Sequence, residues 1–138
     1  MERLAVMRTV LGVIVGYVFF GAASVMLFIV SEHQPHDPAT VPFMIVATIY
    51  GMVAALVGGL IATAISGRLD GRAGAIVAVV IAIGAVISMF SVPEGGQRWS
   101  MVAAIVLMAP MAWLGGKSLT ILKRQLSNLK RETPGGRA

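Results

Sequence analysis

Long apolar stretches alternate with short polar segments along the chain. Four stretches contain no Asp, Glu, Lys, Arg or His: positions 9–30, 41–66, 73–92 and 99–116. An α-helix rises about 1.5 Å per residue, so about 20 residues cross the ~30 Å hydrocarbon core of a bilayer. Transmembrane β-strands alternate apolar and polar residues over about ten positions, which these stretches do not do. The pattern predicts an all-α membrane protein with four transmembrane helices.

The segments between these stretches are short and rich in turn-forming residues. Pro35 and Pro38 separate the first two stretches, Pro42 lies just inside the start of the second, and Pro93 lies between the last two. Short connections place sequential helices side by side in opposite directions. The expected fold is therefore an antiparallel four-helix transmembrane bundle over residues 1–116, followed by a tail over residues 117–138.

Composition agrees with this membrane assignment. Hydrophobic residues make up 57% of the chain and charged residues 12%, whereas a soluble domain carries about 25% charged residues. The chain contains no cysteine, which excludes thiolate metal sites, iron–sulfur clusters and a cysteine nucleophile. We expect neither an enzyme nor a cofactor.

Basic residues are distributed unevenly between the two sides of the predicted bundle. With the N-terminus inside, Arg98 alone lies outside, and ten of the 11 lysines and arginines lie inside: Arg3, Arg8, Arg68, Arg72, Lys117, Lys123, Arg124, Lys130, Arg131 and Arg137. Cytoplasmic segments carry such an excess. We therefore expect a protein integral to the plasma membrane, of the bacterial inner-membrane kind, with both termini cytoplasmic. The positive charge favours anionic inner-leaflet lipids as partners and is a poor reason to propose nucleic-acid binding.

The first apolar stretch resembles a signal peptide at its start, because Arg3 and Arg8 precede it. It continues without charge to Val30, whereas the apolar region of a cleaved signal is 7–15 residues long. We interpret it as an uncleaved membrane anchor.

Small residues recur on the helix faces, most densely in the second stretch. Residues four apart share a helix face, and small residues there let two backbones approach closely. The predicted packing positions are Gly12, Gly16, Gly51, Ala55, Gly58, Gly59, Ala62 and Gly67. They serve packing within one bundle, a seam between copies of the chain, or a surface along which helices slide. Pro110, midway along the fourth stretch, cannot donate a backbone hydrogen bond and predicts a kink.

The outer connection contains the few residues that suit a metal ion. His33, His36 and Asp37 lie close together there, and imidazole and carboxylate groups bind Zn²⁺ or Cu²⁺. The neighbouring prolines equally fit an extended connection whose side chains face water. A metal site is thus one interpretation of this segment.

The tail has a different pattern from the rest of the chain. Leu119, Leu122, Leu126 and Leu129 form one stripe of a helix, with Lys123, Arg124, Lys130 and Arg131 around it. This pattern predicts a short amphipathic cytoplasmic helix. The helix either lies on the anionic inner leaflet or pairs with a partner or a second copy as a short coiled coil. We favour the membrane surface, through Leu122, Leu126 and the four basic residues.

No charged residue lies inside a predicted span, although proton-coupled pumps and carriers of charged substrates normally need one. The leading hypothesis is a structural or accessory membrane protein that packs through small-residue faces with itself or a larger complex. The alternative is a small oligomeric channel or transporter for a neutral or weakly charged solute. An enzyme or metal handler that uses the outer connection ranks last.

Overall fold

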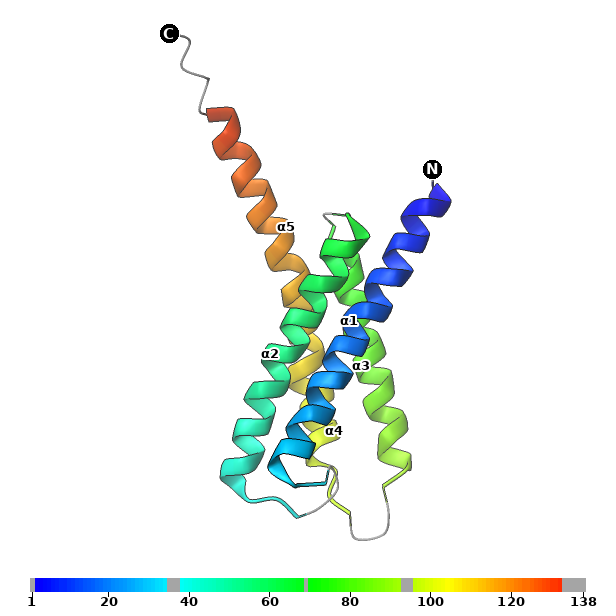
Figure 1. The fold of residues 1–138 in the computed structure, drawn as a ribbon, viewed down its shortest axis with the longest axis vertical. Coiled ribbons are helices and arrows are strands. Elements are labelled where there is room, and N and C mark those ends of the chain that lie inside the picture. The colour runs from blue at the N-terminus through cyan, green and yellow to red at the C-terminus, as the bar shows by residue number, and fades with distance from the viewer. Residues whose placement is uncertain (1, 35–37, 69, 93–95, 133–138) are drawn as a thin grey trace.

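A computed structural model describes residues 2–34, 38–68, 70–92 and 96–132. This part of the chain is helical, with elements α1 (Glu2–Ser31), α2 (Val41–Ser66), α3 (Arg72–Phe90), α4 (Trp99–Ala103), the π-helical η1 (Ala104–Met108) and α5 (Ala109–Glu132) (Figure 1). The last three elements form one helix. Four helices are therefore long and apolar enough to cross a membrane. This confirms the predicted all-helical fold with four such helices.

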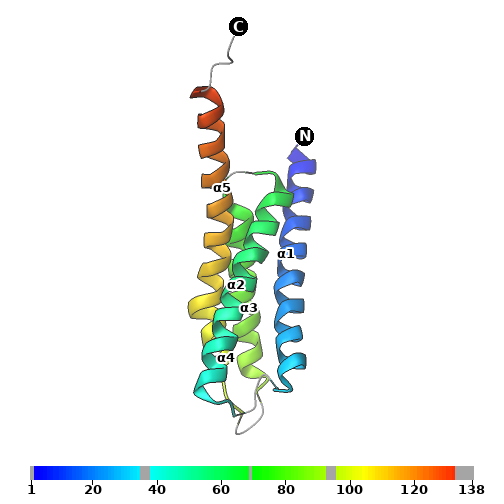
Figure 2. The same cartoon turned by 60° about the vertical axis from the view of Figure 1, so that its left-hand side comes forward.

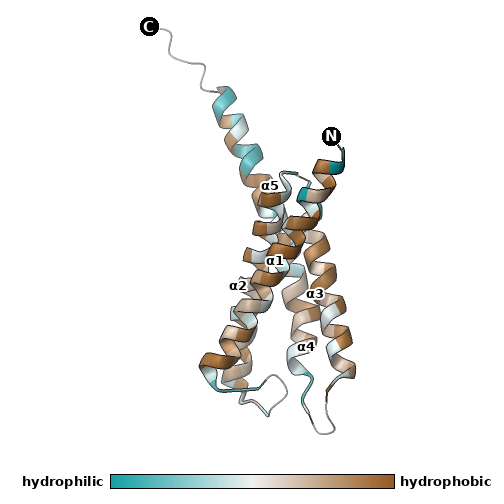
Figure 3. Cartoon of the chain, turned by 45° about the vertical axis from the view of Figure 1, so that its right-hand side comes forward, coloured by the Kyte–Doolittle hydropathy of each residue, from teal (hydrophilic) through white to brown (hydrophobic). Residues whose placement is uncertain are grey.

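The chain passes back and forth between the two ends of one elongated bundle (Figures 1 and 2). We call the end at which α1 begins and α5 ends the terminal end, and the opposite one the loop end. Apolar residues dominate the helices between these ends, whereas hydrophilic residues gather at the start of α1 and in the last part of α5 (Figure 3). The distribution fits a bundle with an apolar belt and polar ends.

Local sequence explains both ends of α2 and the start of α3. Pro42 lies in the first turn of α2, where its missing N–H is not needed. Gly67 ends α2 with a φ of 68°, in the left-handed region that glycine adopts at helix ends. The carboxylate of Asp70 then accepts a hydrogen bond of 3.1 Å from the N–H of Arg72 at the start of α3.

Two helices extend further than the sequence pattern predicts. α1 begins at Glu2 rather than near residue 9, and α5 continues past Gly116 to Glu132. The residues beyond Gly116 are mainly Leu, Lys, Arg and Gln, which favour helix, and no proline interrupts them before residue 134. Residues 117–132 are therefore a continuation of the last membrane-length helix.

The irregular turn in the fourth helix lies just before Pro110. Residues 104–108 are π-helical, and the N–H of Ala109 reaches back to the carbonyl of Ala104. Pro110 has no N–H to offer the carbonyl four residues earlier, so the regular α-helical pattern is interrupted here.

Most of the core side chains are small, and Ile81, Met101 and Met108 are the larger buried ones. Val77 and Thr63 are the largest fully buried ones. α2 carries nine of the buried residues, whereas α1 carries only Gly12 and Gly16. α2 is accordingly the central helix, with α1 on one face and α5 on another.

Candidate functional site

The contact between α1 and α2 brings two backbones together. A Cβ atom on Gly12 would lie 2.5 Å from the carbonyl oxygen of Ala62, and one on Gly58 would lie 2.7 Å from that of Gly16. Real Cβ atoms do not approach oxygen this closely. Glycine at these positions is therefore what lets the two helices touch.

The contact between α2 and α5 has the same character. A Cβ atom on Gly59 would lie within 3.0 Å of the carbonyl oxygen of Ala112, and one on Gly115 within 3.0 Å of that of Leu56. Both helices thus require a glycine where they meet. α2 is held between two such contacts.

The predicted packing positions are distributed as follows. Gly67 is exposed and ends α2, and the other seven are buried: Gly12, Gly16, Gly51, Ala55, Gly58, Gly59 and Ala62. The side chain of Met108 covers Gly51. The small-residue rows of α2 are therefore in contact with other helices of the same chain.

Three buried hydroxyl side chains lie toward the terminal end of the bundle. Ser66 donates to the carbonyl of Thr63 at 2.9 Å, and Thr120 donates to that of Gly116 at 3.1 Å. Thr63 is 1% exposed, and its hydroxyl has no hydrogen-bond partner among the described residues. The Ser66 and Thr120 hydroxyls thus donate to backbone carbonyls of their own helices.

A groove of about 330 Å³ opens between α1, α3 and α4. Tyr17, Ser88 and Ser100 supply its hydroxyl groups, and the rest of the lining is apolar. A Cβ atom on Gly84 would lie 3.2 Å from the Tyr17 hydroxyl. The groove could hold a small neutral molecule, but it has no charged side chain.

Aromatic side chains connect three segments at the loop end. The Phe43 ring stacks on His33 with centroids 4.1 Å apart, and it lies 6.4 Å from the rings of both Phe28 and Trp99. The cluster joins the end of α1, the start of α2 and the start of α4. Of its members, Trp99 is of a type that is enriched at membrane–water interfaces.

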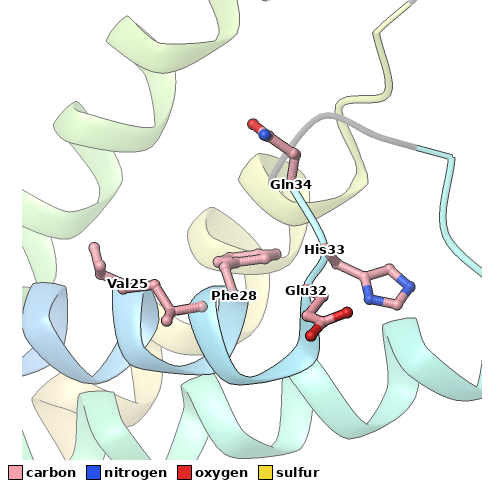
Figure 4. Close-up of a pocket in the computed structure, with 6 residues that line it drawn as sticks. Val25, Phe28, Glu32, His33 and Gln34 are labelled. Atoms are coloured by element: carbon pink, nitrogen blue, oxygen red, sulfur yellow. The ribbon is translucent and has the colours of Figure 1, made fainter.

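His33 belongs to this aromatic cluster, and the structure does not place it in a metal site. Its Nδ1 lies 2.6 Å from the carbonyl oxygen of Ser31. The adjacent pocket of about 420 Å³ also contains Glu32 and Gln34, and Gln34 points away from the other two (Figure 4). His36 and Asp37 lie outside the described residues. Among the residues that are described, no three potential ligands gather.

Charged residues surround the terminal end. Asp70 lies 3.5 Å from Arg68 and 3.4 Å from Arg72, and the Lys117 ammonium lies 3.8 Å above the Trp113 ring. The residues predicted to bind lipid are all exposed on α5 beyond the bundle: Leu122, Lys123, Arg124, Leu126, Lys130 and Arg131.

The apolar stripe of α5 is longer than the four tail leucines that the sequence pattern predicts. The leucine stripe of the tail continues backward into the bundle at alternating spacings of four and three residues. We call this set the α5 seam: Met108, Ala112, Gly115, Leu119, Leu122, Leu126 and Leu129. Such spacing is that of a helix packed along another helix. The seam could have been found in the sequence by extending the heptad across the predicted end of the membrane span.

Comparison of the chain with models of protein families, with curated proteins and with solved structures finds no match.

Proposed function

We propose that this chain is an accessory membrane protein: an antiparallel four-helix bundle that anchors a basic, amphipathic helix at the cytoplasmic surface for a larger membrane complex. The four membrane-length helices support the anchor. The start of α1 and the end of α5 share one end of the bundle (Figure 1), which carries most of the basic residues. The positive-inside rule assigns this end to the cytoplasm of a plasma membrane.

The proposal rests on a difference in contacts between the bundle and the end of α5. The small-residue faces of α2 are used within the bundle, as Gly58 and Gly59 illustrate. Residues 121–131 of α5 project beyond it and are exposed. A partner therefore has an accessible surface on the α5 extension. Anionic lipids are further partners for the basic side chains around it.

The test is the state of the tagged full chain after mild detergent extraction from its native membrane. We expect a complex of defined stoichiometry. Its mass should exceed 14.4 kDa, the mass of one chain, and also the mass of a homo-oligomer of the chain. Light scattering gives its mass, and mass spectrometry its composition. A chain that is recovered only as a monomer contradicts the accessory function.

The groove between α1, α3 and α4, which carries three hydroxyl groups in an otherwise apolar lining, favours the second candidate, a small channel for a neutral solute. Its Tyr17, Ser88 and Ser100 hydroxyls could hydrogen-bond such a solute. Flux of glycerol or urea into liposomes containing the pure chain tests it. Flux that disappears with Tyr17→Phe and Ser88→Ala favours the channel, and flux equal to that of empty liposomes excludes it.

A further inference from the structure

The α5 seam loses its neighbour where α2 ends. Inside the bundle, Ala112 is fully buried against α2 and Gly115 meets the backbone of Leu56. α2 ends at Ser66. Beyond this level the same seam continues, but Leu122 is 53% and Leu126 is 51% exposed. The α5 seam thus extends beyond the end of α2, and α2 covers only its first half.

The direction of the seam argues against burial in the lipid surface. The seam leucines beyond Gly115 lie within about 40° of the direction of Gly115 around the helix axis, and Gly115 meets the Leu56 backbone of α2. The side that carries the exposed Pro110 and Leu114 continues beyond Ile121 as polar residues, among them Gln125 and Asn128. Leu129 lies nine residues beyond Thr120, the last buried residue of α5, or about 14 Å along the helix axis. The seam leucines therefore lie above the bundle rather than on the bilayer beside it.

A second copy of the chain does not fit the exposed seam. Copies in one membrane share the same orientation, so their α5 helices would run parallel. A partner α5 on the exposed seam would continue downward along the lower seam, where α2 already contacts Ala112 and Gly115. The occupant is therefore a segment that ends above the bundle.

The charges around the seam indicate the charge of the segment that binds there. Lys123 and Lys130 each follow a seam leucine by one residue and so flank the seam, as e positions do in a coiled coil. Arg68 and Arg72 lie at the adjacent end of the bundle and both pair with Asp70. The surroundings of the seam are strongly basic, so a complementary partner is acidic.

We infer that the exposed part of the α5 seam, at Leu122 and Leu126, binds an amphipathic helix of another polypeptide whose polar face is acidic. This inference rests on the proposed function, because it places the terminal end in the cytoplasm. The bound helix lies above the terminal end of the bundle and continues the packing that α2 provides below.

The experiment uses the full chain in nanodiscs of phosphatidylcholine, which has no net charge. The probe is a fluorescent peptide of about three heptads with leucine at positions a and d and glutamate at e and g. A matched peptide has lysine in place of glutamate. We expect binding of the acidic peptide, by fluorescence anisotropy, and little binding of the basic one. Added salt should weaken binding, because it screens surface charges.

Two double variants with exposed substitutions test the location. Leu122→Ser with Leu126→Ser should weaken binding about tenfold or more. The matched control, Ile121→Ser with Gln125→Ser, changes a different side of the same turns, about 100° around the helix axis, and should leave binding within about twofold. Equal weakening by both pairs, or no weakening by the first, overturns the inference. Unchanged melting temperatures show that both variants fold.

The other occupants give distinct results. A bimane probe on Leu126→Cys that shifts to the blue with anionic lipid alone shows that the seam lies on the membrane and overturns the inference. A dimer of the wild type that Leu122→Ser with Leu126→Ser dissociates shows a second copy and also overturns it. If the native membrane complex persists in this double variant, the inference fails while the accessory function stands. If the peptide binds but no native complex exists, the accessory function fails alone.

Discussion

The close contact between α2 and α5 predicts that one methyl group at Gly59 destabilises the bundle. In Gly59→Ala, the new Cβ would lie within 3.0 Å of the carbonyl oxygen and the carbonyl carbon of Ala112. Both atoms belong to the backbone, so a side-chain rotation cannot relieve the overlap. α5 as a whole has to move away from α2.

The magnitude follows from comparison with Gly21→Ala. Both glycines lie inside helices, so alanine gains about 1 kcal/mol of helix propensity at each. No atom lies within 4 Å of a Cβ at Gly21. The difference between the two variants is therefore the overpacking cost alone, about 1–3 kcal/mol. Gly51→Ala should fall between them, since its Cβ meets only the flexible side chain of Met108.

The assay is heating in mild detergent, followed by tryptophan fluorescence and by the fraction of chain that stays monodisperse. A difference of 1 kcal/mol corresponds to roughly 3–5 °C in Tm for a chain of this size. Gly59→Ala should thus melt at least ~3 °C below Gly21→Ala. Equal Tm values, or a lower Tm for Gly21→Ala, would refute the close contact and the central place of α2.

Three further predictions concern other parts of the chain. The native sequence has no cysteine, so in intact cells an impermeant thiol reagent should label Gln34→Cys and leave Ser127→Cys unlabelled; the reverse pattern contradicts the proposed topology. Because the buried Thr63 hydroxyl has no hydrogen-bond partner among the described residues, Thr63→Val should change the free energy of unfolding by less than about 0.5 kcal/mol or increase it. A loss above about 1 kcal/mol in the same heating assay would show that the hydroxyl does form a hydrogen bond. Phe43→Ala removes the ring that stacks on His33 and should speed amide hydrogen exchange at the end of α1. Exchange at the end of α5 should not change and is the internal control. Unchanged exchange at both places would show that the aromatic cluster does not stabilise the end of α1.

The sequence by itself determined the four membrane-length helices, because burial in lipid demands long runs without charge and satisfies backbone groups within each helix. It also determined the ends of α2, through Pro42 and Gly67. These features depend on local chemistry and on the solvent, and both can be read from neighbouring residues.

Only the tertiary structure decided which neighbours the small residues meet. Gly58 and Gly59 are adjacent in sequence, yet one contacts α1 and the other α5. A row of small residues indicates close approach without naming the partner, since residues of one chain and of a second copy fit it equally well. The fold assigns both glycines to contacts inside the chain.

The tertiary structure also changed the interpretation of the tail. The leucine pattern alone fits a helix on the membrane and a helix against a protein, because both need one apolar stripe. The direction of that stripe depends on how the preceding turns are packed. Gly115 faces α2, and helical geometry carries the same side upward to Leu122 and Leu126. The sequence thus specified the apolar stripe, and the packing of α5 against α2 determined which way it faces.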